Sequence, residues 1–201
     1  LVNGESFRFY FGQREAIETL VYLTEIRKER GSKALVQKFG EIFYPQGTQP
    51  QLVGTDIEYQ TSMDGQDQIR RYIPEIDAIT IQDLPDGNLS RHAFKMATGS
   101  GKTIVMAMAI VWSFFHKRMV KSSPLSANFL VIAPNVIVYQ RLEKDFGSNR
   151  IFNALPLIPP EWQSQWGMKV ILRGESTEPD ASGNLFLTNI HQVYESRDEA
   201  W

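Results

Sequence analysis

Residues 95–103 read Lys-Met-Ala-Thr-Gly-Ser-Gly-Lys-Thr, and this stretch decides the fold class of the chain. Its two glycines let backbone N–H groups turn inward around phosphate oxygens. An apolar run, Ala93–Met96, precedes the turn, and a helical pattern, Thr103–Arg118, follows it. A helix that begins there adds the positive end of its dipole. A strand, a glycine-rich turn and a helix in this order are typical of a phosphate-binding loop.

The side chains of the loop have separate expected roles. Lys102 is expected to reach the β- and γ-phosphates of a nucleotide, and the Thr103 hydroxyl to ligate Mg²⁺. Both are therefore candidate catalytic residues, and Thr103 is the candidate metal ligand. The candidate nucleotide-binding residues of the loop are Thr98, Gly99, Ser100, Gly101, Lys102 and Thr103. The alternative is a Gly/Ser turn that ends in Lys-Thr by coincidence.

One position departs from the general pattern of such loops. That pattern places glycine five residues before Gly101, where this chain has Met96. A kinase-like phosphate loop is disfavoured for this reason.

Apolar strands and helical patterns alternate after the loop. Strands are predicted at Asn128–Ala133, Met168–Leu172 and Leu185–Leu187, and a helix at Val136–Phe146. With Ala93–Met96 they make four strands, each nearly continuous in apolar character. Such strands, separated by helices or long crossovers, indicate a parallel sheet covered by helices on both faces. The predicted class is α/β.

The chain divides into three parts by pattern. Residues 1–43 are expected to be helical, with one helix beginning near Gln13 and a second over Lys33–Phe43. Residues 44–91 are rich in proline, glycine and polar side chains, and an irregular insertion with no long element is expected there, although short strands such as Ile79–Ile81 are compatible with the sequence. Residues 92–201 form the predicted α/β core.

Composition excludes several classes of protein. The 201 residues carry a net charge of −2, so a wholesale basic nucleic-acid coat is excluded, although a local basic groove is not. Cysteine is absent, which excludes a disulfide scaffold and a thiol nucleophile. No apolar stretch approaches the roughly 20 residues of a membrane span, so a cytoplasmic protein is expected. The first residue is Leu1 rather than methionine, and we expect a piece of a longer protein.

Four stretches together resemble a known family. Residues 96–103 resemble motif I of superfamily 2 helicases and translocases, and are most similar to the DEAD/DEAH-related Res subunits of type III restriction enzymes. Residues 9–17 (Phe-Tyr-Phe-Gly-Gln-Arg-Glu-Ala-Ile) resemble the Q-motif region of that family. Residues 129–135 resemble motif Ia, and residues 185–190 resemble motif Ib. The four stretches occur in the family's order and span nearly the whole chain.

The resemblance implies a RecA-like P-loop NTPase domain, the first of two motor domains, with ATP and Mg²⁺ bound between them. It implies that Gln13 hydrogen-bonds the adenine edge, because an amide supplies both a donor and an acceptor. Phe11 or Arg14 could then stack on the base. The alternative for Gln13 is an exposed residue of the first helical turn or a helix cap.

The resemblance also implies a DNA-binding edge of the sheet. Pro134, Asn135, Thr188 and Asn189 follow the ends of two predicted strands. Ligands of open α/β sheets bind at that carboxyl edge, where small polar groups grip nucleic-acid phosphates without reading sequence. The alternative is ordinary turn and cap chemistry, which asparagine and threonine also favour.

The family hydrolyses ATP with a second, acidic motif at the end of a buried strand. Asp198-Glu199 spells the beginning of such a motif, but the preceding residues 194–197 are polar, and a decoy is the favoured interpretation. The true acidic motif, the second motor domain and any nuclease domain are then expected beyond Trp201. Hydrolysis by these 201 residues alone is expected to be very slow.

The sequence therefore predicts the ATP-binding motor domain of a DNA translocase, the Res subunit of a type III restriction system. Its expected partners are double-stranded DNA, contacted at the backbone, and a modification methyltransferase subunit. One rival is a DEAD-type RNA helicase domain, disfavoured by the Met-Ala-Thr opening of the loop and the preceding insertion. The other is a nucleotide-binding regulatory module that never hydrolyses.

Overall fold

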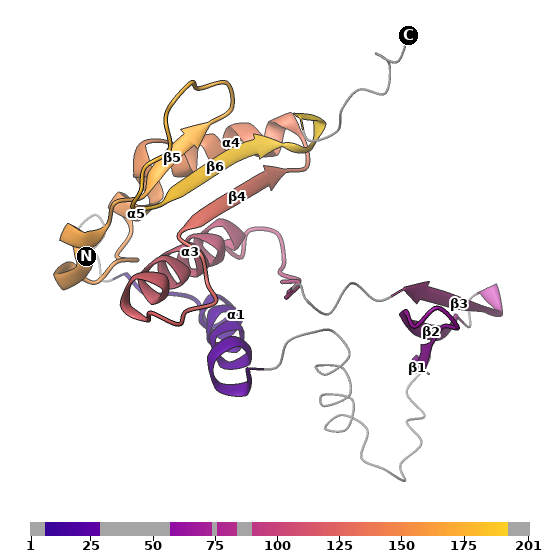
Figure 1. The fold of residues 1–201 in the computed structure, drawn as a ribbon. Helices are drawn as coiled ribbons and strands as arrows, with labels where there is room; N and C mark the ends of the chain where they lie inside the picture. Colours follow the sequence, from indigo (N-terminus) through magenta and orange to yellow (C-terminus); the bar gives the residue numbers. More distant parts are fainter. Residues whose placement is uncertain (1–6, 29–56, 74–75, 84–89, 193–201) are drawn as a thin grey trace. The chain divides into compact units, whose positions relative to one another are not determined.

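A computed structural model describes residues 7–28, 57–73, 76–83 and 90–192. The chain divides into two compact units (Figure 1). The first combines the residues up to Ile17 with those from Met96 onward, and the second comprises Glu18–Lys95. The N-terminal turns of the first helix therefore belong to the same unit as the phosphate loop.

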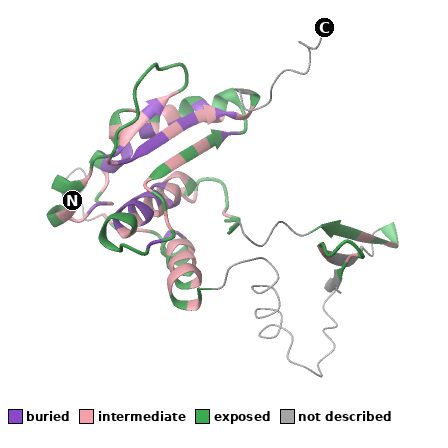
Figure 2. Cartoon of the chain, in the orientation of Figure 1, coloured by how far each residue is buried: buried purple, intermediate pink, exposed green. Residues whose placement is uncertain are grey.

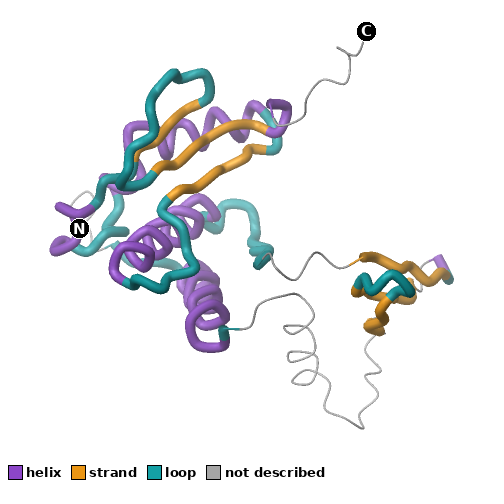
Figure 3. The backbone as a smooth tube through the Cα atoms, in the orientation of Figure 1, coloured by secondary structure: helices purple, strands orange, loops and turns teal. Residues whose placement is uncertain are grey.

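A parallel sheet forms the centre of the first unit. Its strands are β4 (Asn128–Ala133), β5 (Lys169–Leu172) and β6 (Asn184–Asn189), in the order β4-β6-β5. The three strands lie side by side in one layer (Figure 3). Both neighbouring pairs are parallel, and Ala133 at the end of β4 lies opposite Asn189 at the end of β6. The predicted α/β class with a parallel sheet is confirmed.

Helices follow the predicted pattern closely. α3 (Lys102–Met119) begins directly after the glycine-rich turn, and α4 (Val136–Phe146) has the bounds expected from the sequence. The shorter elements are η3 (Gly147–Asn149), α5 (Arg150–Ala154), η4 (Pro160–Gln165) and η5 (Ile190–Gln192). No helix of the described residues is long and apolar enough to cross a membrane.

The core lies between the sheet and these helices (Figure 2). Phe114 of α3, Phe146 of α4 and Leu185 of β6 are fully buried in it. Trp166 packs edge-on at 4.8 Å between ring centroids from Phe114 and tilted at 4.8 Å from Phe152. The large rings that follow Pro159-Pro160 therefore belong to the core.

The sheet is less fully covered than the sequence predicted. Burial alternates along β4, and Leu130 and Ile132 remain 61% and 40% exposed, whereas Phe129 and Val131 pack against the core. Among the described residues, helical cover on both faces is thus incomplete at these two positions.

The strand predicted at Ala93–Met96 is not formed. Residues 90–97 have neither helical nor strand structure, and Phe94 is 42% exposed. A strand needs a hydrogen-bonded neighbour, and the strands of the described residues leave this segment without one. The apolar run alone was insufficient to predict the element.

A buried asparagine holds the segment that leads into β6. The Asn184 side chain is 4% exposed; its Nδ2 donates to Asn128 Oδ1 and to the Asp180 carbonyl, each at 2.8 Å, and its Oδ1 accepts from Asp180 N at 2.7 Å. Asp180 Oδ1 in turn accepts from Ser182 N at 2.7 Å, and this hydrogen bond lowers the pKa of the Asp180 carboxyl. The network fixes where β6 begins.

Asn184→Ala is expected to destabilise the protein by about 1–3 kcal/mol, because buried donors and acceptors lose their partners. Urea unfolding followed by circular dichroism measures the change. Asn153→Ala, at an exposed position of α5, is the matched control and should stay within about 0.5 kcal/mol. Equal losses of stability in the two variants would contradict a stabilising role for the Asn184 hydrogen bonds.

The second unit contains an antiparallel sheet where an irregular insertion was expected. β1 (Ile57–Thr61), β2 (Asp67–Ile73) and β3 (Ala78–Asp83) pair in that order. The β1–β2 turn closes with Ser62 N donating to the Gln66 carbonyl at 2.8 Å and with Gly65 at φ +82°. The short strand expected at Ile79–Ile81 is confirmed as part of β3. β1 and β2 were not predicted, because polar residues alternate with β-formers in them and mask short strands.

The first helix is confirmed. α1 (Phe11–Val21) continues as a π-helical segment, η1 (Tyr22–Arg27), and ends at Lys28 with φ +54°. The second helix expected at Lys33–Phe43 lies outside the described residues.

Candidate nucleotide-binding site

The glycine-rich turn adopts the backbone that its sequence predicts. Gly99 and Gly101 have φ of +80° and +84°, a conformation that residues other than glycine rarely adopt. Gly101 is the residue before α3 and carries no side chain to cap it, so the first N–H groups of α3 face the turn without a side-chain acceptor. These groups suit an anion.

The loop lies toward the carboxyl edge of the sheet. In its C-terminal half, α3 is hydrogen-bonded to the segment that enters β4, where Ser113 Oγ donates to the Ser126 carbonyl at 2.8 Å. That segment lies at the amino edge of the sheet, so the N-terminus of α3 points toward the opposite, carboxyl edge. Ligands of parallel α/β sheets bind at that edge.

Lys102 folds back over the loop. Its Nζ donates to the Ala97 carbonyl at 2.8 Å, and Ser100 Oγ donates to the same oxygen at 2.7 Å. The Lys102 side chain is nevertheless exposed, whereas Thr103 in the first turn of α3 is half-buried. A phosphate oxygen can replace the Ala97 carbonyl as the acceptor for the ammonium group.

Gln13 is part of the same site. Its side chain is 1% exposed, its Oε1 accepts from Tyr10 N at 3.0 Å, and its Nε2 donates to the Ser100 carbonyl at 3.0 Å. The structure thus joins two motifs that lie 87 residues apart in the sequence. The amide faces the loop, while Phe11 and Arg14 beside it on α1 are exposed.

The residues expected at the DNA-binding edge fall into two kinds. Pro134 and Asn135 are exposed after β4, and Thr188 is half-buried near the end of β6. Asn135 Oδ1 accepts from Val138 N at 2.9 Å and so caps α4. Asn189 is 1% exposed, and its Oδ1 has no hydrogen-bond partner within the described part of the chain.

Arg173 was missed by the sequence reasoning. It follows β5, whose Leu172 lies opposite Leu187 of β6, so Arg173 joins the carboxyl edge of the sheet. Its side chain is exposed, and its backbone N–H donates to the Tyr139 hydroxyl at 3.2 Å. The sequence signal that could have identified Arg173 is a cationic residue directly after an apolar strand.

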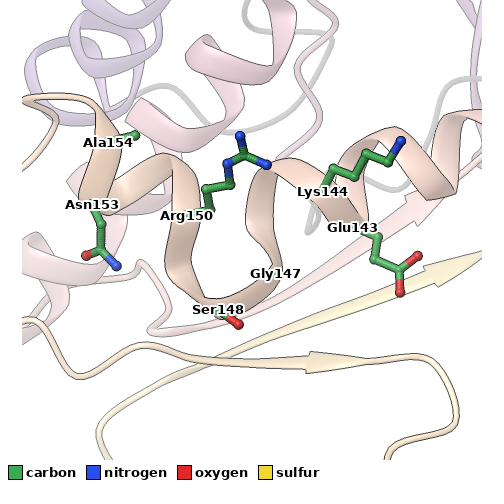
Figure 4. Close-up of a pocket in the computed structure, with 7 residues that line it drawn as sticks. All are labelled: Glu143, Lys144, Gly147, Ser148, Arg150, Asn153 and Ala154. Carbon is green, nitrogen blue, oxygen red and sulfur yellow. The ribbon is translucent and has the colours of Figure 1, made fainter. Parts of the chain in front are cut away.

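A separate hollow of about 720 Å³ lies at the C-terminal end of α4 (Figure 4). Seven residues line it: Glu143, Lys144, Gly147, Ser148, Arg150, Asn153 and Ala154. It is wide open, and α4 begins at the carboxyl edge, so the hollow lies toward the amino edge, away from the phosphate loop.

Metal ligands from the protein are sparse. Within the described ranges, no three histidine or acidic side chains gather as a metal site. The described residues would fit Mg²⁺ as part of a nucleotide complex, in which the Thr103 hydroxyl would be the expected protein ligand and phosphate oxygens would supply the others. Asp198 and Glu199 lie outside the described residues.

One family of proteins matches most of the chain. The family described as "Type III restriction enzyme, res subunit" matches residues 58–200. No curated protein and no solved structure matches. Gln13 lies before the matched residues, so its place in the site rests on its contacts with the loop. The phosphate loop, the parallel sheet and this match agree, and the chain belongs to the type III restriction enzyme Res family, with a RecA-like motor domain of helicase superfamily 2.

Proposed function

We propose that this chain is the ATP-binding motor domain of a DNA translocase, the restriction subunit of a cytoplasmic type III restriction system. The observation that carries the proposal is the phosphate loop at the N-terminus of α3, with Lys102 exposed over it. An ammonium group, glycine-supported backbone N–H groups and a helix dipole together favour a nucleotide polyphosphate.

ATP with Mg²⁺ is the proposed ligand. Residues 98–101 would hold the phosphates through their backbone, Lys102 through its charge, and Thr103 would hold the metal ion. Bound ATP supplies a γ-phosphoryl group whose transfer to water drives movement. A water-activating carboxylate would come from residues outside the described ranges, and a second motor domain would complete the cleft.

Double-stranded DNA is the proposed track. Pro134, Asn135 and Thr188 lie where two parallel strands end, and Arg173 adds a cation at the same edge. Small polar groups and one cation suit contacts with the phosphate backbone, which position DNA without reading its sequence. A methyltransferase subunit would supply recognition of the site, and a nuclease domain the cleavage.

Calorimetric titration of the full-length protein with ADP and with GDP, each with Mg²⁺, tests the proposal. ADP is expected to bind and GDP to bind more weakly. Absence of binding by either nucleotide would contradict the proposed function. Equal affinities for ADP and GDP would contradict the expected contact between Gln13 and the adenine base.

Asn135→Asp tests the DNA-binding edge. Aspartate caps a helix as well as asparagine does, so α4 is expected to remain intact. The added negative charge should weaken binding to double-stranded DNA about fivefold at low salt through repulsion of phosphates. Fluorescence anisotropy with labelled DNA measures the change, and Asn153→Asp on α5 is the matched control. Equal weakening by both variants would contradict a contact at this edge.

A further inference from the structure

We infer that Gln13 is a positioning residue of the phosphate loop and that it contributes to nucleotide affinity whichever base the nucleotide carries. The inference rests on the proposed nucleotide-binding function. It differs from adenine recognition, because it concerns what the amide does to the loop rather than to the ligand.

The first observation is that both ends of the Gln13 amide are bonded within the protein. Oε1 holds Tyr10 N, and Nε2 holds the Ser100 carbonyl, each at 3.0 Å. The side chain is 1% exposed, so water competes little with these bonds. Gln13 therefore fixes the Ser100 peptide from the outside of the loop.

The second observation concerns Gly101. A Cβ built on Gly101 would collide with Nε2 of Gln13 and lie 3.3 Å from its Cδ. The amide thus occupies the space that a side chain would need, directly beside the residue at φ +84°. Gln13 supports a backbone conformation that only glycine adopts easily.

The third observation is that the opposite side of the loop is held by its own residues. Ser100 Oγ and Lys102 Nζ both donate to the Ala97 carbonyl. Lys102 must leave this carbonyl to reach a phosphate, while the Gln13 bond continues to tie the Ser100 carbonyl to α1. The loop keeps its curvature during the exchange because Gln13 stays in place.

Inorganic tripolyphosphate with Mg²⁺ separates this role from base recognition, because it carries phosphates and no base. Gln13→Ala and Gln13→Met should each weaken tripolyphosphate binding about fivefold, which corresponds to one lost hydrogen bond to the loop. Methionine keeps the length and volume of the side chain, so this variant carries the test if alanine impairs folding. Gln140→Ala, at an exposed position of α4, is the control and should bind like the wild type.

Unchanged tripolyphosphate affinity in both Gln13 variants would overturn the inference. If Lys102→Ala still lowers that affinity, the proposed function survives this failure. If the wild type and Lys102→Ala bind tripolyphosphate equally, the proposed function itself fails.

A double-mutant cycle on thermal unfolding gives a readout that needs no ligand. Gly101→Ala should lower the unfolding midpoint more in the wild type than in the Gln13→Ala background, since removal of the amide opens the space for Cβ. The strain of a positive φ is common to both backgrounds and cancels in the cycle. Additive effects would show that Gln13 does not support Gly101 and would overturn the inference.

Discussion

Lys102→Ala is expected to lower the affinity for ATP with Mg²⁺ about 100-fold and to reduce ATP hydrolysis to background. The ammonium group lies over the phosphate loop, with its Nζ 2.8 Å from the Ala97 carbonyl. A charge-assisted bond to phosphate is stronger than the bond to this neutral oxygen, which drives the exchange. Calorimetry and phosphate release measure both effects in the full-length protein.

Controls separate this effect from a general loss of charge or of structure. Lys121 lies just after the C-terminus of α3, far along the helix from Lys102. The substitution Lys121→Ala should therefore leave nucleotide affinity unchanged. Because Lys102 is exposed, its removal should change the free energy of unfolding by no more than about 0.5 kcal/mol. Unaltered ATP affinity in a folded Lys102→Ala protein would show that the loop binds no phosphate.

Phe114→Ala is expected to destabilise the protein by about 3–5 kcal/mol. Phe114 is fully buried on α3, and its ring lies 5.2 Å from that of Phe115 and 4.8 Å from that of Trp166, between centroids. A Cβ built on Gly183 would come within 2.8 Å of Phe114 Cε2, so the chain entering β6 packs tightly against this ring. Alanine would leave a cavity where α3, Trp166 and the start of β6 meet.

Denaturant unfolding of Phe114→Ala measures this loss. Ile137→Ala provides a control on α4, since Ile137 is 66% exposed and its truncation should cost about 0.5 kcal/mol or less. Phe114→Leu should fall between the wild type and Phe114→Ala, because leucine fills part of the cavity. A loss no larger for Phe114→Ala than for Ile137→Ala would contradict the position of the core.

The two substitutions act on the same helix in different ways. Lys102 lies in the exposed first turn of α3, and Phe114 lies on its buried face three turns later. The first should remove binding and preserve folding. The second should weaken folding, and its nucleotide affinity should remain normal at temperatures where the protein is folded.

Local patterns predicted the elements whose signals lie within a few residues. The apolar run of β4 ends before Pro134, and Asn135 caps α4 through Val138 N, so both bounds could be predicted. The glycines of the phosphate loop need positive φ, and their spacing before Lys102 predicted the turn. In each case, the residues that decide the structure are neighbours in the chain.

Patterns failed where backbone pairing between strands decides the structure. Residues 93–96 are apolar like β4, but the described strands offer them no neighbour. Residues 57–83 are polar, but each strand there finds an adjacent partner through a short connection. Apolar content predicts burial, whereas a strand exists only where its backbone groups are paired.

By itself, then, the sequence determined the phosphate loop, α3, the β4–α4 unit and the family to which the chain belongs. Only the tertiary structure decided that the Gln13 amide binds the loop, that Asn189 is buried, and that Arg173 joins the carboxyl edge. The physical reason is the distance along the chain over which each interaction acts. Turn and helix preferences act over a few residues, but the contact between Gln13 and Ser100 exists only after the packed core brings α1 against the loop.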